Sequence, residues 1–225
     1  MKKVLLVTHH EYNDIGNISR ILYQNFLLTT VSYKHLNKIT NKMINNFDLI
    51  ILFGGKMSAN SKSRFIKDEY KFISKIFALN KSTIGICLGA QLIAKFFGSR
   101  IIKDRYKRVE VGYRQSLNCE KNFFKKSKMS FLQFHNEGIC YNKNMNVLAQ
   151  GRIFEVDAYK IINKNIYGFQ FHPEVNSHMI SQWYGNLENV KKGTDKLSNI
   201  LKDYDRFKLD NYRWLRNTIL RILND

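Results

Sequence analysis

Three short apolar runs, placed well apart along the chain, most constrain what this sequence can fold into. They are VLLV at 4–7, DLIILF at 48–53 and STIGIC at 82–87. Continuous apolar runs of this length are typical of parallel strands that helices cover on both faces. Helical spacing follows the runs, so the alternation predicts an α/β fold with an open, mixed, largely parallel sheet flanked by helices.

Three helices are expected around these strands. The first is indicated by apolar residues that can share one buried face: Ile18, Ile21, Leu22 and Phe26. The second covers apolar positions between 65 and 77. The third is GAQLIAKFFG at 89–98, closed by Gly98.

Residues 100–171 have a different texture, with short apolar runs separated by polar connections. These runs predict short strands, partly antiparallel: RII (100–102), VEVGY (109–113), SFLQF (130–134), NVLAQ (146–150), EVDAYKII (155–162) and NIYGFQF (165–171).

The pattern turns helical beyond Val175. Apolar stripes at 197–204 and 209–223 indicate helices, and Gly193 with Thr194 predicts a break and an N-cap between helices of this region. We expect one domain over residues 1–182 and a C-terminal helical extension over residues 183–225 that packs on it. The alternative is a hairpin that docks a partner or forms a homodimer.

The formal net charge is +19, from 37 Lys and Arg against 18 Asp and Glu. A basic chain attracts nucleic acid or anionic lipid when its charge gathers on one face. Here Lys and Arg recur throughout, which indicates solvated surface charge, so nucleic acid is not an expected partner. The tightest cluster, KNFFKKSK at 121–128, is either a contact for an anionic partner or a loop anchored by its Phe residues.

The three Cys residues are Cys87, Cys119 and Cys140. They form no CxxC pair and no His and Cys ligand spacing, so we predict neither a disulfide framework nor a metal site, and no cofactor. Apolar runs at 4–7 and 84–97 are too short for a signal-peptide core and a bilayer span, respectively. A cytoplasmic protein without a membrane partner is expected.

GICLG at 85–89 places Cys87 between two glycines, where a predicted strand passes into a predicted helix. This is the form of a nucleophile elbow. Small flanking residues let strand and helix approach closely, while the nucleophile lies at the carboxyl end of the strand, where open α/β sheets bind ligands. The helix N-terminus favours the thiolate. A structural Cys in an apolar strand is the alternative.

A Cys nucleophile needs a general base that a third group orients. FQFHPEV at 169–175 offers both. His172 and Glu174 are two residues apart, so on an extended strand their side chains point to the same side and the carboxylate can hold the imidazole. Pro173 fixes the backbone between them.

The paired glycines Gly54 and Gly55 end the second apolar run. Backbone N–H groups from such a turn, together with the N–H of Leu88 after the candidate nucleophile, can form an oxyanion hole. An ordinary turn is the alternative. All three elements lie at predicted strand ends, which favours one shared site.

With these elements the chain resembles class I glutamine amidotransferases, in particular the GMP synthase amidotransferase domain as a stand-alone protein. The resemblance implies a flavodoxin-like fold. The matching segments occur in the family's order: LFGGKMS (52–58), GICLGAQLIA (85–94), VEVGY (109–113), FHNE (134–137), VDAYKI (156–161) and YGFQFHPEV (167–175).

The resemblance implies that Cys87 attacks the side-chain amide of glutamine to give a γ-glutamyl thioester. The N–H groups of Gly55 and Leu88 would hold the oxyanion. His172 would give a proton to the departing ammonia and then activate water, while Glu174 orients it. The products would be glutamate and ammonia for an unidentified acceptor.

Three further residues are implied to bind or line the substrate site: Gly54, Gln91 and His135. The chain departs from the family pattern at Lys56, Phe134 and Asn136–Glu137. These positions touch the predicted pocket rim and leave Cys87, His172 and Glu174 unchanged. The sequence therefore defines the type of reaction better than it defines the substrate.

Glutamine or another γ-glutamyl compound is the expected substrate, and a separate synthetase subunit or a directly bound acceptor the expected partner. A GxxxxGK(S/T) motif for an ATP-binding synthetase is absent. The first alternative is a γ-glutamyl peptidase or hydrolase that transfers no ammonia. The second is a basic binding protein in which the three site elements are relics.

Overall fold

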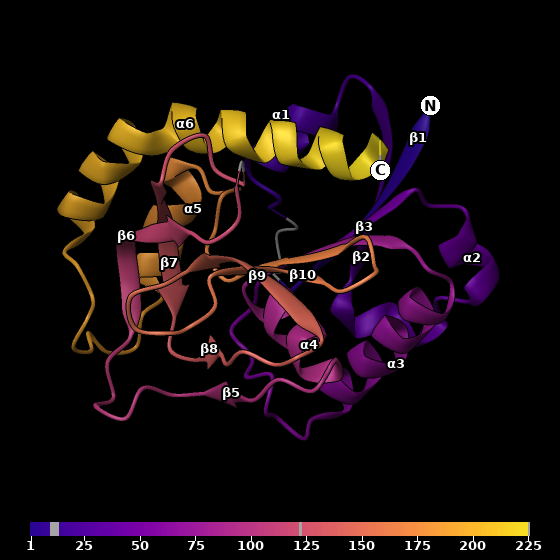
Figure 1. Cartoon of the computed structure of the whole chain (residues 1–225), viewed down its shortest axis with the longest axis horizontal. Coiled ribbons are helices and arrows are strands. Elements are labelled where there is room, and N and C mark those ends of the chain that lie inside the picture. The colour runs from indigo at the N-terminus through magenta and orange to yellow at the C-terminus, as the bar shows by residue number, and fades with distance from the viewer. Residues whose placement is uncertain (10–13, 122, 225) are drawn as a thin grey trace.

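The computed structural model describes residues 1–9, 14–121 and 123–224. Within these residues, nine strands form one sheet in the order β2-β1-β3-β4-β11-β10-β9-β6-β7 (Figure 1). Their bounds, in that order, are Phe26–Ser32, Lys2–Thr8, Leu49–Leu52, Ser82–Ile86, Ile166–Phe169, Ala158–Ile161, Met145–Gln150, Glu110–Asn118 and Lys128–His135. Strands β5 (Ile101–Ile102) and β8 (Gly138–Ile139) pair separately.

The sheet is parallel from β2 to β11 and antiparallel from there to β7. The predicted α/β class is therefore confirmed. The predicted change to partly antiparallel strands after residue 100 is confirmed as well. The parallel half brings the carboxyl ends of β1, β3 and β4 to one edge, where open α/β sheets bind ligands.

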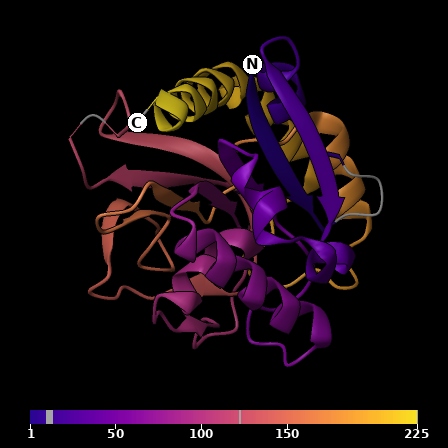
Figure 2. The ribbon, with the colours of Figure 1, turned by 90° about the vertical axis from the view of Figure 1, so that its right-hand side faces the viewer.

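Helices cover both faces of the sheet, because alternate residues of the buried strands point to opposite sides. One core joins the sheet to η1 (Tyr33–Lys38), α2 (Asn41–Asn45), α3 (Arg64–Ala78) and α4 (Leu88–Phe96). The opposite face packs against α1 (Asn17–Leu22) and α6 (Leu197–Asn224). A smaller core links α5 (Ser177–Gly185) with β6 and β7. Figures 1 and 2 show this layering.

The first predicted helix is too long. It ends at Leu22, and Phe26 begins strand β2, which pairs with β1 in parallel. β2 contains the β-branched residues Thr29, Thr30 and Val31, which suit a strand. Because β2 is an edge strand with much of its surface exposed, it lacks the continuous apolar run that marks a buried strand.

The predicted break at Gly193 and Thr194 lies between α5 and α6, but Thr194 is not the N-cap of α6, because that helix begins at Leu197. Thr194 instead pairs with Val111 in a parallel bridge, and both apolar stripes lie on the single helix α6. The stripe at 197–204 packs with β6 and β7, while the second reaches the main core. Leu209 does not, because it is 62% exposed.

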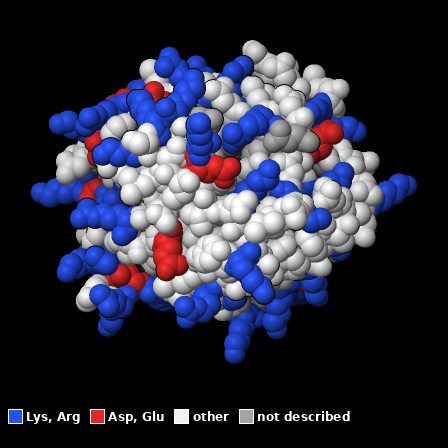
Figure 3. All heavy atoms as spheres, viewed as in Figure 1, with Lys and Arg blue, Asp and Glu red and all other residues white. Residues whose placement is uncertain are grey.

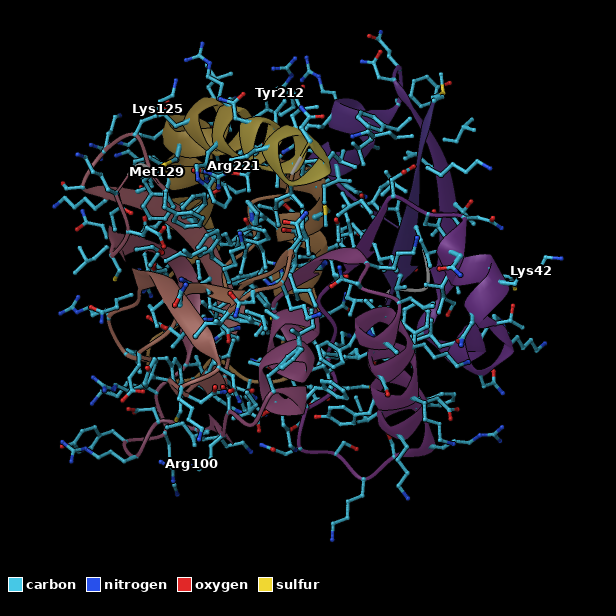
Figure 4. The ribbon with its side chains drawn as sticks, turned by 45° about the vertical axis from the view of Figure 1, so that its right-hand side comes forward. Lys42, Arg100, Lys125, Met129, Tyr212 and Arg221 are labelled. Carbon is cyan, nitrogen blue, oxygen red and sulfur yellow. The ribbon has the colours of Figure 1, made fainter. Side chains whose placement is uncertain are left out.

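Trp214 of α6 anchors this helix to the sheet. Its ring lies 5.0–5.8 Å from five Phe rings, and its Nε1 donates to the Phe123 carbonyl at 3.1 Å. Two of these rings, Phe123 and Phe124, belong to the basic cluster at 121–128 and are buried. The two Phe residues thus anchor this part of the chain to the core, as the second interpretation of the cluster expects. Met129 and Tyr212, labelled in Figure 4, pack against the same core from β7 and α6.

The basic side chains are spread over the molecule. Figure 3 shows Lys and Arg along much of the outline of one face, most densely on its left. Lys42, Arg100 and Lys125 extend outward from distant parts of the chain (Figure 4). Among the described helices, none combines the length and apolar character that crossing a bilayer requires.

Replacing Gly89 with Ala tests the close packing of α4. The added Cβ would lie 2.2 Å from the carbonyl oxygen of Leu52 on β3, a clash that the backbone cannot relieve without moving the strand. We expect Gly89→Ala to lower the free energy of unfolding by about 1–3 kcal/mol, measured by urea denaturation. Gly185→Ala is the control, since no atom lies within 4 Å of its Cβ position, and it should be neutral or slightly stabilising. Equal stability of both variants would contradict the packing described.

Candidate active site

Cys87 lies between β4 and α4 in a strained conformation, with φ 48° and ψ −106°. Such a conformation costs a non-glycine residue about 1–3 kcal/mol and persists only when the surroundings impose it. Here the Cys87 N–H donates to the Phe169 carbonyl at 2.7 Å. The flanking glycines permit close contact, because a Cβ on Gly85 would lie 2.7 Å from the Ala90 nitrogen and one on Gly89 would meet β3. This is the geometry of a nucleophile elbow.

His172 and Glu174 meet in a buried pair just beyond β11. The His172 Nδ1 lies 2.8 Å from the Glu174 Oε1, with side chains 4% and 1% exposed. The backbone of both residues is fixed, since the His172 N–H donates to the Leu132 carbonyl and the Glu174 carbonyl accepts from Asn17. The imidazole ring also packs edge-on against Trp183, with centroids 4.8 Å apart.

Gly54 brings the Cys and the His together. Its Cβ position lies 2.9 Å from the His172 Cε1 and 3.2 Å from the Cys87 Cβ, so any side chain there would displace one of them. Gly55 follows beside Leu88, whose Cδ2 is 3.1 Å from its Cβ position. The turn after β3 and the start of α4 therefore face each other at the predicted oxyanion site.

The charge state of His172 is set by its partners. Burial alone lowers the pKa of His172, but the Glu174 carboxylate and the charge and hydrogen bond of Cys87 outweigh it and raise that pKa to about 10. A buried imidazolium is thus stabilised between two acidic groups. This arrangement can hold a proton next to the sulfur and deliver it to a leaving group.

A pocket of about 360 Å³ opens over these residues. Of the predicted site residues, five line it: Gly55, Cys87, Gln91, His135 and His172. Gly54, Leu88 and Glu174 are not in its lining. Gly54 separates the two reactive side chains, and Glu174 supports His172 from behind.

Gln91 and His135 reach the pocket while held by internal hydrogen bonds. The Gln91 Nε2 donates to the Glu137 carbonyl at 2.8 Å and to the Gln170 Oε1 at 3.2 Å. The His135 Nε2 lies 2.9 Å from the Gln133 Oε1. Burial, with the nearby charge of His172, lowers the pKa of His135 to about 3, so its imidazole is neutral.

A buried carboxyl group lies behind His135. The Gln133 Nε2 donates to the Asp157 carboxyl at 3.1 Å, and Ser116 donates to the same oxygen. Burial raises the pKa of Asp157 to about 7, against the opposing effect of these two donors. Asp157 is therefore largely protonated below neutral pH.

The sequence analysis missed part of the pocket wall. Trp183 contacts His172, and the segment 186–191 after α5 lines the opening. Glu137, recognised only as a departure at the rim, is a buried carboxylate that accepts from the Ser58 hydroxyl at 2.7 Å. Trp183 is at helical spacing from the buried Met179 and Ile180 of α5, which could have indicated that it faces inward. The segment 186–191 carries no periodic pattern.

Residues 14–184 match the sequence profile of class-I glutamine amidotransferases. The chain therefore belongs to this family. It is 34% identical over 98 residues to one of the subunits of the glutamine-hydrolyzing GMP synthase of Methanobrevibacter smithii, covering 41% of this chain and 50% of that protein. A glutamine-hydrolyzing GMP synthase of Borrelia garinii subsp. bavariensis is 34% identical over 153 residues, covering 64% and 26%.

The chain spans about half the length of the first of these curated relatives. A glutamine amidotransferase of Thermotoga maritima with a crystal structure has the same fold, with a TM-score of 0.87 and 22% identity over 100% of this chain and 99% of that one. The resemblance stated from the sequence is thus confirmed at the level of family and fold.

The raised pKa of Asp157 predicts a stability that depends on pH. Its folded pKa of about 7 exceeds the ordinary value of 3.8, so its contribution is fully present below about pH 4 and is lost as the pH rises through 7. We expect the urea midpoint of the wild type to fall between pH 5 and 8, and that of Asp157→Asn to change less. The exposed Glu155→Gln should keep the wild-type dependence. Parallel curves for wild type and Asp157→Asn would contradict this assignment.

Proposed function

We propose that the chain hydrolyses the side-chain amide of glutamine to glutamate and ammonia, with Cys87 as nucleophile. The observation that carries this proposal is the convergence of Cys87, His172 and Gly54, with Glu174 bonded to the imidazole. The family membership supports amide chemistry on glutamine. The geometry supports nucleophilic catalysis by a Cys beside a His that a carboxylate orients.

In the first half-reaction the Cys87 sulfur attacks the amide carbon, and a C–S bond forms as the carbonyl π electrons move to oxygen. The N–H groups of Gly55 and Leu88 stabilise this oxyanion, which is usually among the largest catalytic effects. As the tetrahedral species collapses, the C–N bond breaks. The His172 imidazolium gives its proton to the leaving nitrogen, and ammonia departs from a γ-glutamyl thioester.

In the second half-reaction water attacks the thioester carbon. His172, now neutral, takes a proton from the water, and the same oxyanion site holds the second tetrahedral species. Its collapse breaks the C–S bond and releases glutamate. Glu174 keeps the ring oriented and stabilises its charged form throughout.

The charged groups of the pocket suit the ends of an amino acid. Glu137 lies in the lining, where its backbone carbonyl accepts from Gln91, and its carboxylate offers a partner for an α-ammonium group. Lys56 lines the same pocket and offers one for an α-carboxylate. Gln91 and His135 add polar walls between them. These lining residues support a γ-glutamyl substrate whose α-ammonium and α-carboxylate groups are both unmodified.

The acceptor of the ammonia belongs to this proposal as well. One relative is named as part of a GMP synthase with separate subunits, which supports delivery to a separate synthetase. The second candidate function is hydrolysis of small γ-glutamyl compounds. It is favoured by the pocket wall at 186–191, which extends the lining beyond the reactive residues and can contact a group carried on the γ-nitrogen.

Assaying both substrates tests the choice. We expect wild-type protein to release ammonia from glutamine faster than it cleaves γ-glutamyl dipeptides, and addition of a candidate synthetase to leave that order unchanged. Turnover of γ-glutamyl dipeptides without glutaminase activity would contradict the first function and support the second, hydrolysis of small γ-glutamyl compounds.

Labelling with a glutamine-like electrophile, 6-diazo-5-oxo-norleucine, tests the nucleophile. We expect the label on Cys87, and loss of both labelling and glutaminase activity in Cys87→Ala. Cys119→Ala and Cys140→Ala are the matched controls and should behave as wild type. His172→Ala should lower kcat by about 10⁴-fold or more. Label on Cys119 or Cys140 that spares Cys87, found by peptide mass analysis, would contradict the mechanism.

The pH profile tests the link between Glu174 and His172. Since the carboxylate raises the pKa of His172, its removal should lower that pKa, and activity that needs the imidazolium should be lost at lower pH. We expect the alkaline limb of kcat/KM to begin nearer neutrality in Glu174→Gln than in wild type. Glu120→Gln, at an exposed site, should leave the limb in place. An unmoved limb in Glu174→Gln would show that another group controls it.

A further inference from the structure

A second buried His and carboxylate pair lies near the candidate active site and has no role in the mechanism above. His9 follows β1 at the carboxyl edge of the sheet, and Glu69 comes from α3. The His9 Nε2 lies 2.8 Å from the Glu69 Oε1, and the two side chains are 1% and 0% exposed. A strand of the sheet and a helix that covers one of its faces are thus joined by one polar contact.

The pair reaches the oxyanion turn through direct packing. The Cβ position of Gly55 lies 2.7 Å from the His9 Cβ and 3.0 Å from its Cγ, so the base of the imidazole lies against the Gly55 backbone. The same position lies 3.1 Å from the Leu88 Cδ2. His9 is further fixed by stacking on Tyr33, with ring centroids 5.1 Å apart. Gly55 therefore packs against both the base of the His9 ring and the Leu88 side chain at the start of α4.

The pair is costly as a packing element alone. Glu69 lies on the apolar face of α3 with Ile66, Phe72, Ile73 and Ile76. The His9 Nδ1 and the Glu69 Oε2 are buried without a hydrogen-bond partner among the described residues. An apolar pair of similar volume would avoid this cost. The contact instead gives His9 a defined orientation, which apolar packing does not impose.

We propose that His9 and Glu69 are positioning residues that fix the Gly55 N–H for the oxyanion. Glu69 holds the imidazole, and the imidazole holds the Gly55 backbone against Leu88. This proposal rests on the proposed function, since the oxyanion is that of glutamine hydrolysis. It predicts that the pair affects oxyanion stabilisation and leaves both the nucleophile and substrate binding in place.

Five variants test the proposal: His9→Ala, His9→Gln, Glu69→Ala, Glu69→Gln and Ile73→Ala. The Gln variants keep a side chain that can make the hydrogen bond, and Ile73→Ala removes packing from the same face of α3. We expect both Ala variants of the pair to lower kcat for glutamine about 10- to 100-fold with KM within about twofold. Both Gln variants should recover most of kcat. Ile73→Ala should lose thermal stability and keep kcat.

Two further measurements separate positioning from general damage. Alkylation of Cys87 by iodoacetamide needs no oxyanion hole, so its rate constant should stay within about twofold of wild type in all five variants. Amide hydrogen exchange at residues 53–56 should be faster in His9→Ala and Glu69→Ala than in wild type and Ile73→Ala.

The outcomes distinguish the two proposals. Unchanged exchange at 53–56, or a kcat loss that follows thermal stability as in Ile73→Ala, overturns the positioning role. An equal loss of alkylation rate overturns it too. If wild type lacks glutaminase activity while exchange still responds to the pair, the proposed function fails and the positioning of the turn stands.

Discussion

The close approach of α4 to β3 and β4 is the contact on which the site depends. Without a Cβ at Gly85 and Gly89, the helix can begin directly against the strands, and the chain can hold Cys87 at a positive φ. That strain is small beside the burial of the surrounding apolar core. The same approach places Leu88 beside Gly55. One packing constraint thus orients the sulfur, the helix terminus and half of the proposed oxyanion site.

Burial makes this geometry effective, because interactions between charges strengthen when water is excluded. The His172 and Glu174 side chains are nearly inaccessible, and their backbones are held by bonds from β7 and from the start of α1. Desolvation would by itself discharge the imidazole, yet the neighbouring acidic groups reverse the shift. The site therefore depends on several elements at once, and no single strand or helix could supply it.

The parallel half of the fold and the candidate reactive residues were predictable, since buried strands are apolar throughout and the elbow carries glycines for a steric reason. Strand β2 was missed because an edge strand exposes much of its surface and has no apolar run. The N-cap of α6 was misplaced because Gly193 and Thr194 resemble a helix start, whereas the pairing of Thr194 with Val111 of β6 is a long-range contact. The packing of His9 against Gly55 is also a long-range contact, and no local sequence pattern indicates it.

Part of the pocket wall lies outside the region that matches the family. The family match stops at residue 184, and the segment 186–191 that lines the opening follows directly. The residues that follow this segment are hydrogen-bonded to β6. There the Arg114 guanidinium donates to both the Gly193 carbonyl and the Asp195 carboxylate. The wall is thus built on a fixed base, separate from the reactive residues. If the proposed function holds, changes in this wall would alter which γ-glutamyl compound or partner is accepted while Cys87 and His172 keep their geometry.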